Sequence, residues 1–169
     1  MAGVFSFPNP VNEKAARVVA GVAMLTAIVI LATGWYWLLV PLAYGFWARV
    51  LTGPTLSPLA RLAMNHVAPR LGAPKHVPGP PKRFAQGMGA AITTAAAVLA
   101  LGLGAHVAAD VLLVALAAAA GLESIFAFCL GCTVFAGLMR AGVVPASVCE
   151  ECADIWSRPG ALTDRVSSG

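Results

Sequence analysis

The chain has 169 residues, of which 59% are hydrophobic and 11% are charged, and its formal net charge is +4. Soluble domains carry about 25% charged residues, and a chain this short cannot bury so much apolar surface in a globule that faces water. The composition therefore excludes an ordinary soluble domain and predicts one domain with lipid as its main solvent.

The positive charges gather in the first half of the chain. No Asp or Glu occurs between Glu13 and Asp110. The basic residues of this interval include Arg17, Arg49, Arg61, Arg70, Lys75, Lys82 and Arg83. No nucleic-acid recognition motif accompanies them, so nucleic acid is not an expected partner. Because lysine and arginine beside membrane segments mark the cytoplasmic side, we expect these residues to lie there.

Residues 18–48 form an apolar run without a charged residue. One span needs about 20 residues and two need roughly twice as many, so length alone does not decide between them. A single span would place Arg17 and the basic segment 49–83 on opposite sides of the membrane, against the positive-inside rule. We therefore predict a hairpin of two helices, about 13–33 and 36–52.

Aromatic residues mark the turn of this hairpin. Trp35, Tyr36 and Trp37 follow one another there, and such side chains favour the membrane–water interface. At the opposite end, Arg17 and Arg49 are expected to extend their guanidinium groups to the membrane surface.

A polar connection follows over residues 53–83. Its stretch "SPLARLAMNHVAPRLG" predicts an amphipathic surface helix at 57–71, because a Ser-Pro start precedes a short apolar stripe. The next stretch, "GAPKHVPGPPKR", is too rich in proline for a helix, so 72–83 is expected to be a linker. His66 and His76 lie in these segments and are expected to be solvated.

The second apolar block predicts two more spans, about 84–103 and 107–127, the last with a helical extension to about residue 140. In the first of them, Ala85, Gly89 and Thr93 repeat small side chains at intervals of four, which allows close helix packing.

Four spans place both termini on the same side, which the basic residues assign to the cytoplasm. The predicted fold is thus all-α: a polytopic membrane protein with a four-helix transmembrane bundle of two hairpins. Residues 1–155 would form a single membrane domain, and 156–169 a polar cytoplasmic tail. The alternative is a fifth span at 124–139, which would move the tail to the outside.

The four cysteines form two CxxC pairs. Cys129 and Cys132 lie in the apolar stretch "FAFCLGCTVFAGLM", whereas Cys149 and Cys152 lie in the acidic stretch "SVCEECADIW". The spacing matches a four-thiolate zinc site. It also matches two redox dithiols, in which one thiol attacks a disulfide and the other resolves the product. A third interpretation makes Cys129 and Cys132 small hydrophobic residues of a core.

Neither pair is expected to be strongly activated, because apolar surroundings and nearby carboxylates both raise a thiol pKa. The segment between the pairs contains a helix stop and Pro145, so it can fold the tail back. The main hypothesis is exchange between the membrane dithiol Cys129–Cys132 and the tail dithiol Cys149–Cys152.

Two acids lie in the second apolar block. Acids in membrane segments are costly and often functional. Asp110 is expected to cap the fourth span near the outer surface, and His106 to lie at the interface. Glu123 lies deeper, six residues before Cys129, where it can accept a thiol proton, bind a cation or pair with an arginine.

Several stretches together resemble a known family. They are "NPVNEKAARV", "SPLARL", "GPPKRFAQGMG", "FCLGC" and "VCEEC". From about Asn9 to Asp154 the chain is similar to a family of small bacterial membrane proteins catalogued as a domain of unknown function (number 4395). The resemblance implies a multi-span membrane protein, with thioredoxin-like proteins or sulfurtransferases as partners, and it favours Cys129 and Cys132 as the site.

The sequence therefore predicts an inner-membrane protein of thiol–disulfide or sulfur-transfer chemistry. One alternative is a scaffold stabilised by zinc on Cys129, Cys132, Cys149 and Cys152, with zinc as the one implied cofactor. The other is a small permease subunit with Glu123 or Asp110 in its pathway. Stripes of small residues also allow a homodimer.

Overall fold

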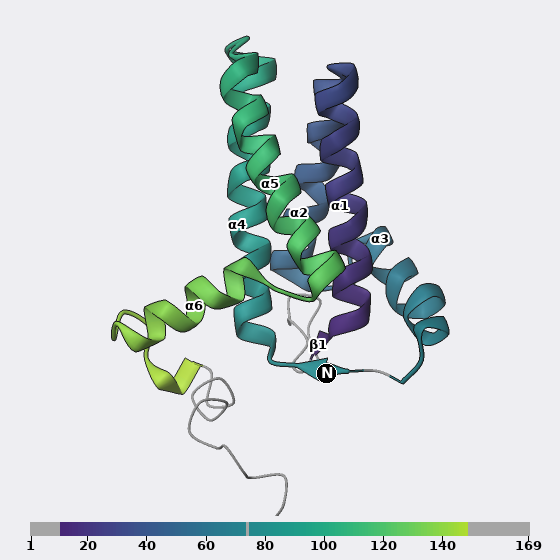
Figure 1. Ribbon diagram of the computed structural model, residues 1–169, viewed down its shortest axis with the longest axis vertical. Helices are drawn as coiled ribbons and strands as arrows, with labels where there is room; N and C mark the ends of the chain where they lie inside the picture. Colours follow the sequence, from purple (N-terminus) through teal and green to yellow (C-terminus); the bar gives the residue numbers. More distant parts are fainter. Residues whose placement is uncertain (1–10, 74, 149–169) are drawn as a thin grey trace, which may run out of the picture.

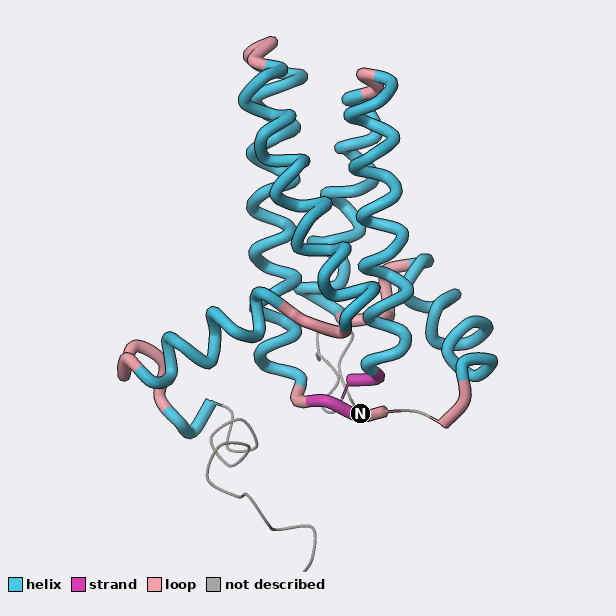
Figure 2. The backbone as a smooth tube through the Cα atoms, viewed as in Figure 1, coloured by secondary structure: helices cyan, strands magenta, loops and turns pink. Residues whose placement is uncertain are grey.

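The computed structural model describes residues 11–73 and 75–148, and this part of the chain is almost entirely helical (Figures 1 and 2). The α-helices are α1 (Glu13–Thr33), α2 (Leu39–Thr52), α3 (Pro58–Leu62), α4 (Gly79–Ala97), α5 (His106–Phe126) and α6 (Leu130–Arg140). Two short strands, β1 (Val11–Asn12) and β2 (His76–Val77), pair antiparallel at the base of the molecule. This pairing ties the start of α1 to the segment that precedes α4.

Helix α1 has the bounds expected for the first apolar run. Its N-terminus is capped by Asn12, whose side chain accepts a hydrogen bond from the amide of Lys14, and Glu13 adds a favourable acid in the first turn. It ends at Gly34, which adopts the left-handed conformation that glycine tolerates best. A 3₁₀ turn, Tyr36–Leu38, then leads into α2.

The connection between α2 and α4 differs in part from the predicted one. Helix α3 starts at the Ser57 cap and continues as π-helical and 3₁₀ turns to Leu71, so the predicted surface segment is helical. The predicted linker 72–83, however, overlaps α4, which already begins at Gly79. Proline is unfavourable inside a helix but well suited to its first turn, where Pro80 and Pro81 lie.

The long helices pack in pairs. Helix α1 lies along α5, α2 lies along α4, and α4 also contacts α5 (Figure 1). The core between them consists largely of alanines, which let the backbones approach closely, together with Ile30, Leu39 and Leu113. At Gly89 a Cβ atom would overlap the ring of Phe46, so the predicted small-residue stripe of α4 is used for close packing against α2.

At the far end of the bundle, Asp110 does not cap a helix. Helix α5 begins at His106 after Ala105, which provides no side-chain cap. Asp110 instead accepts a hydrogen bond from the hydroxyl of Tyr36 at 2.9 Å, and the Tyr36 ring stacks on His106. These contacts join the tip of the first hairpin to the start of α5.

The predicted continuous helix from about 107 to 140 is broken. Helix α5 ends at Phe126, and Ala127 adopts a positive φ of 58°. Helix α6 then starts at Leu130 and projects sideways from the base of the bundle (Figure 1). Because the break falls directly before the first CxxC pair, Cys129 becomes the residue that caps a new helix.

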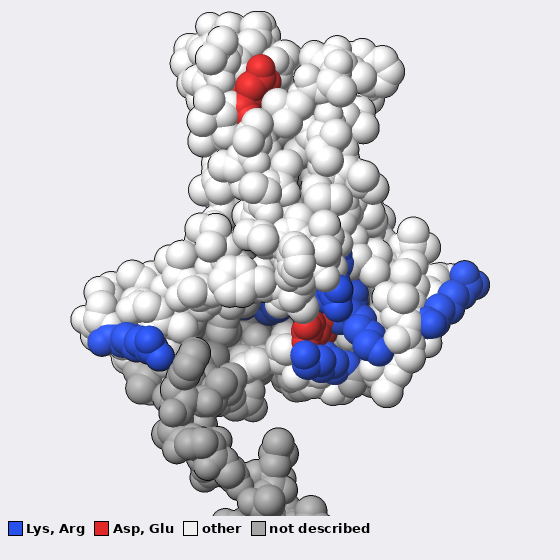
Figure 3. All heavy atoms as spheres, in the orientation of Figure 1, with Lys and Arg blue, Asp and Glu red and all other residues white. Residues whose placement is uncertain are grey.

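Three helices of the described residues are long and apolar enough to cross a membrane. They are α1, α4 with its π-helical extension to Gly102, and α5. Large apolar side chains such as Leu25, Ile28 and Val111 are exposed on them, as expected for lipid-facing surfaces. Basic side chains gather at the base of the molecule, whereas the upper part of the bundle shows almost none (Figure 3). The chain is thus a helical protein with membrane-spanning character.

Candidate functional site

The first CxxC pair lies at the N-terminus of α6, where the break after α5 exposes the first-turn amides. Cys129 has extended backbone angles and is the N-cap of α6. Its Sγ accepts a hydrogen bond from the amide of Cys132 at 3.3 Å. Thr133 holds the same turn from the other side, because its hydroxyl donates to the carbonyl of Cys129 at 3.2 Å. The helix start therefore directs the amide N–H of Cys132 at the sulfur atom of Cys129.

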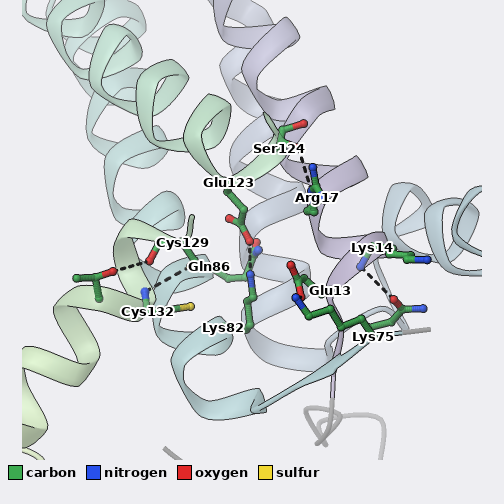
Figure 4. A network of polar contacts seen from close by, with 12 residues as sticks. Glu13, Lys14, Arg17, Lys75, Lys82, Gln86, Glu123, Ser124, Cys129 and Cys132 are labelled. Carbon is green, nitrogen blue, oxygen red and sulfur yellow. Dashed lines mark hydrogen bonds and ion pairs between the residues drawn. The ribbon is translucent and has the colours of Figure 1, made fainter. Parts of the chain in front are cut away.

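A buried ion pair lies beside the two thiols. Lys82 in the first turn of α4 binds Glu123 near the end of α5, with their side chains only 8% and 13% exposed (Figure 4). Glu123 thus pairs with a lysine rather than with an arginine. The pair fixes the start of α4 against the end of α5, and it places a cation close enough to Cys129 to favour its thiolate.

The two thiols differ in acidity. The hydrogen bond from Cys132 lowers the pKa of Cys129 below its ordinary value, with a further contribution from the Lys82 cation, although burial and Glu123 oppose the change. The same thiol–thiol hydrogen bond, together with burial, raises the pKa of Cys132. Cys129 is therefore the thiol suited to nucleophilic attack, and Cys132 retains its proton until later.

Arg49 in α2 is a second buried cation. It contacts Gln86, which lies one helical turn after Lys82 in α4. It is 6% exposed rather than extended to the surface, a difference from the sequence-based prediction. Its Nε donates to Gln86 at 2.7 Å, and its guanidinium lies 4.6 Å from the centroid of the Phe46 ring. These partners compensate the burial of the charge, which is why Arg49 need not reach water.

Arg17 contacts the C-terminal end of α5. Its guanidinium donates to the carbonyls of Ser124 and Ile125, both at 3.0 Å, at the C-terminal end of α5. Terminal helix carbonyls have no partner within the helix, and a cation satisfies them. Arg17 therefore fixes the point at which α5 ends and the chain turns toward Cys129 (Figure 4).

Cys129 borders two separate spaces. On one side lies a groove of about 820 Å³ along α6, which Cys132 and Lys82 also line. On the other side lies a cavity of about 150 Å³ within the helix bundle, which Arg49 and Glu123 also line. With 8% of its surface exposed, Cys129 separates the two spaces.

The approach of α6 to α4 depends on Gly131. A Cβ atom at this position would lie 2.6 Å from the Cα of Ala85. We expect Gly131→Ala to destabilise the protein by about 1–3 kcal/mol, the usual cost of overpacking. Gly137→Ala in the same helix is the matched control, because its Cβ would meet nothing within 4 Å and alanine favours helix by about 1 kcal/mol. Thermal unfolding in detergent compares them, and equal midpoints would contradict the close contact.

The structure brings together part of the predicted site. Cys129, Cys132 and Glu123 lie in one cluster, whereas Cys149 and Cys152 fall outside the described residues. Within residues 11–73 and 75–148, no three His, Cys, Asp or Glu side chains gather to hold a metal ion. The two tail cysteines needed for a four-thiolate zinc site are therefore not among the residues that the structure places.

Sequence reasoning did not assign Lys82, Arg49 or Gln86 to the site. Lys82 and Gln86 both lie in the stretch "GPPKRFAQGMG". Helical spacing puts these two residues on one face of α4. The polar side chain of Gln86 on an otherwise apolar face could have indicated that this face belongs to the site. Arg49 gave a weaker signal, since Phe46 precedes it by three residues, a spacing that permits a cation–aromatic contact.

Comparison with known proteins identifies the family but no characterised relative. Searches of the curated proteins and of the solved structures gave no match. A family profile matches residues 11–140, which include the first CxxC pair and end before the second. The chain therefore belongs to the family described as a domain of unknown function (DUF4395).

Proposed function

We propose that this chain is an inner-membrane protein in which Cys129 and Cys132 perform thiol–disulfide exchange. The observation that carries the proposal is the position of Cys129. Its sulfur caps α6, accepts a hydrogen bond from the amide of Cys132 and lies near Lys82. Cations and helix N-termini both favour a thiolate, which is the reactive form. Cys132 lies one turn further on and is placed to resolve the product.

The proposed topology has α1, α2, α4 and α5 as four spans with both termini in the cytoplasm. The basic side chains at the base of the bundle support this orientation (Figure 3), and the exposed Trp35 and Trp37 at the opposite end are typical of a membrane–water interface. Helix α2 has 14 residues, or about 21 Å of helix, and its preceding 3₁₀ turn lengthens it. In this arrangement α3 and α6 lie along the cytoplasmic surface, and the site lies where the bundle meets it.

The proposed reaction has two steps. The Cys129 thiolate attacks a disulfide of the partner, so that a mixed disulfide forms and one partner thiolate leaves. Cys132 then loses its proton to that thiolate and attacks the sulfur of Cys129. The Cys129–Cys132 disulfide forms, the second partner thiolate leaves, and two electrons have passed to the partner. The reverse sequence oxidises a partner dithiol.

The tail pair Cys149–Cys152 is the proposed internal partner. Helix α6 is about 16 Å long, at 1.5 Å per residue. The eight residue-to-residue steps from Ala141 to Cys149 can span as much as about 28 Å when extended. Chain length therefore permits a tail thiol to return to the groove beside Cys129. A thioredoxin-like protein or a sulfurtransferase is the proposed external partner, and it would use the same groove.

A mixed-disulfide trap tests this proposal. We expect Cys132→Ser to accumulate a disulfide between Cys129 and a tail or partner cysteine, since the resolving thiol is absent. Cys129→Ser is the control and should accumulate none. Acid quench, alkylation and peptide mass spectrometry would identify the linked residues. Equal trapping by both variants, or by neither, would contradict the assigned roles.

Sulfur transfer is the second reaction that Cys129 could perform. The lowered pKa of its thiol supports this reaction as well as disulfide exchange. A carried sulfur would appear as a persulfide, which adds one sulfur atom to the mass of the Cys129 peptide. The same mass spectra therefore distinguish it from a disulfide. The permease alternative has less support, because Glu123 is engaged by Lys82. A transport activity that survives replacement of all four cysteines would favour it.

A further inference from the structure

The cavity within the bundle reaches Cys129 from the side opposite to the groove. Its volume is about 150 Å³, and its walls come from α1, α2, α4, α5 and α6. Along α4 it extends from Ala85 to Ile92, or about 10 Å of helix. An engineered apolar cavity of about 150 Å³ binds benzene, so this space matches a single six-membered ring.

The rim of the cavity faces the lipid side. Met88, Ala115, Ala119 and Leu130 line it and are themselves half-buried or exposed, and all four are apolar. They belong to α4, α5 and α6, between which the cavity opens. A ligand that enters here would come from the bilayer, since a solute from the cytoplasm would meet the groove on the other side of Cys129.

Part of the cavity lining is polar. Arg49, which is 94% buried, lines it with Gln86, Glu123 and the Cys129 thiol. Only the Nε of Arg49 has a hydrogen-bond acceptor among the described residues, so its other N–H groups remain as donors. A ligand for this space thus combines an apolar ring with an oxygen acceptor at the end nearest the thiol.

We infer that this cavity binds a lipid-soluble quinone, whose ring fills the apolar space and whose carbonyl oxygen accepts hydrogen bonds from Arg49 and Gln86. This inference rests on the proposed thiol–disulfide exchange and names the second reactant of the same site. The groove then serves a protein or tail thiol, and the cavity serves a membrane-dissolved carrier. One sulfur atom, Cys129, has access to both.

The oxidation balances as a two-electron step. The Cys129 thiolate adds to a ring carbon of the quinone and forms a C–S bond. Cys132 gives its proton to a quinone oxygen and attacks the sulfur of Cys129, so the C–S bond breaks and the disulfide forms. The electron pair stays on the ring, which takes a second proton from water and leaves as the hydroquinone.

The test uses the full chain in lipid nanodiscs with a benzoquinone that carries a ten-carbon tail, under anaerobic conditions. The rate of disulfide formation is followed by alkylation and mass spectrometry as the quinone concentration increases. We expect saturation, because a bound complex precedes the reaction. Uncatalysed attack of an exposed thiol would instead give a rate that rises linearly with quinone concentration.

Cavity-filling variants provide the specific comparison. Ala119→Leu should lower the quinone-dependent rate at least tenfold, since the added atoms enter the cavity. Ala118→Leu is the matched control, because Ala118 is exposed on the same helix and does not line the cavity; it should retain the rate. Arg49→Met should raise the quinone concentration at half-saturation about tenfold. Ala119→Leu and Ala118→Leu should exchange normally with oxidised glutathione, because neither residue lines the groove.

The two proposals fail in different ways. Normal exchange with glutathione and an unchanged quinone rate in Ala119→Leu would overturn the cavity assignment alone, as would a linear dependence on quinone concentration. Absence of exchange with both reagents in the unaltered protein would overturn the thiol–disulfide function itself.

Discussion

Lys82→Met is expected to destabilise the protein by roughly 3–5 kcal/mol. The substitution removes one partner of a buried ion pair and leaves the Glu123 carboxylate without its cation in a site that is 13% exposed. Loss of the Lys82 charge should also raise the pKa of Cys129, because that cation favours its thiolate. Denaturant unfolding in mixed micelles measures the first effect, and the pH dependence of alkylation measures the second.

A double variant separates the ion pair from the loss of a side chain. Lys82→Met combined with Glu123→Leu removes both charges, and a buried pair replaced by apolar residues is often neutral or stabilising. We therefore expect the double variant to be more stable than Lys82→Met alone. Arg61→Met, which removes an exposed cation of α3, should change stability by no more than about 0.5 kcal/mol. Additive losses in the double variant would contradict a coupled pair.

The second large effect concerns the order in which the thiols react. In a Cys149→Ser, Cys152→Ser background, iodoacetamide should modify Cys129 at lower pH than Cys132. Cys129 has a lowered pKa and Cys132 a raised one, and one pKa unit changes the thiolate fraction tenfold below the pKa. At neutral pH we expect the thiolate fractions to differ at least about tenfold.

Removal of the second thiol tests the cause of this difference. Cys132→Ala deletes the donor that stabilises the Cys129 thiolate, so the alkylation profile of Cys129 should move to higher pH. The midpoint of the profile is the quantity to compare, because restricted access of the reagent lowers the rate at every pH by the same factor and leaves the midpoint in place. An unchanged midpoint in Cys132→Ala, or reaction of Cys132 before Cys129 in the protein that keeps both thiols, would show that the hydrogen bond does not set the acidity of Cys129.

Much of the helical architecture could be predicted because apolar runs and turn signals are local. Helix α1 begins after Asn12 and ends before Gly34, and both limits follow from capping chemistry that the sequence displays. Two other helix boundaries, the start of α4 and the end of α5, were not predicted. Pro80 and Pro81 indicated a linker, although the first turn of a helix accepts proline. The break at Ala127 has no local signal, since alanine rarely adopts a positive φ.

The site itself was predicted only in its cysteines and Glu123. The acidity of Cys129 could not be predicted, because it depends on the break after Phe126 that makes this residue a helix cap. Arg49 was expected to extend to the membrane surface, and Lys82 was expected in a linker on the cytoplasmic side. Their burial depends on partners 37 and 41 residues away in sequence, Gln86 and Glu123. Such long-range pairs follow from the packing of α2, α4 and α5, which no local pattern specifies.

A redox titration tests most directly whether Cys129 and Cys132 perform thiol–disulfide exchange. The purified chain with Cys149→Ser and Cys152→Ser would be equilibrated in dithiothreitol buffers of graded potential, alkylated and analysed by peptide mass spectrometry. We expect a reversible Cys129–Cys132 disulfide whose fraction changes with the two-electron slope, about 30 mV for each tenfold change. Two thiols that stay free across the whole range, or oxidise only irreversibly, would contradict it.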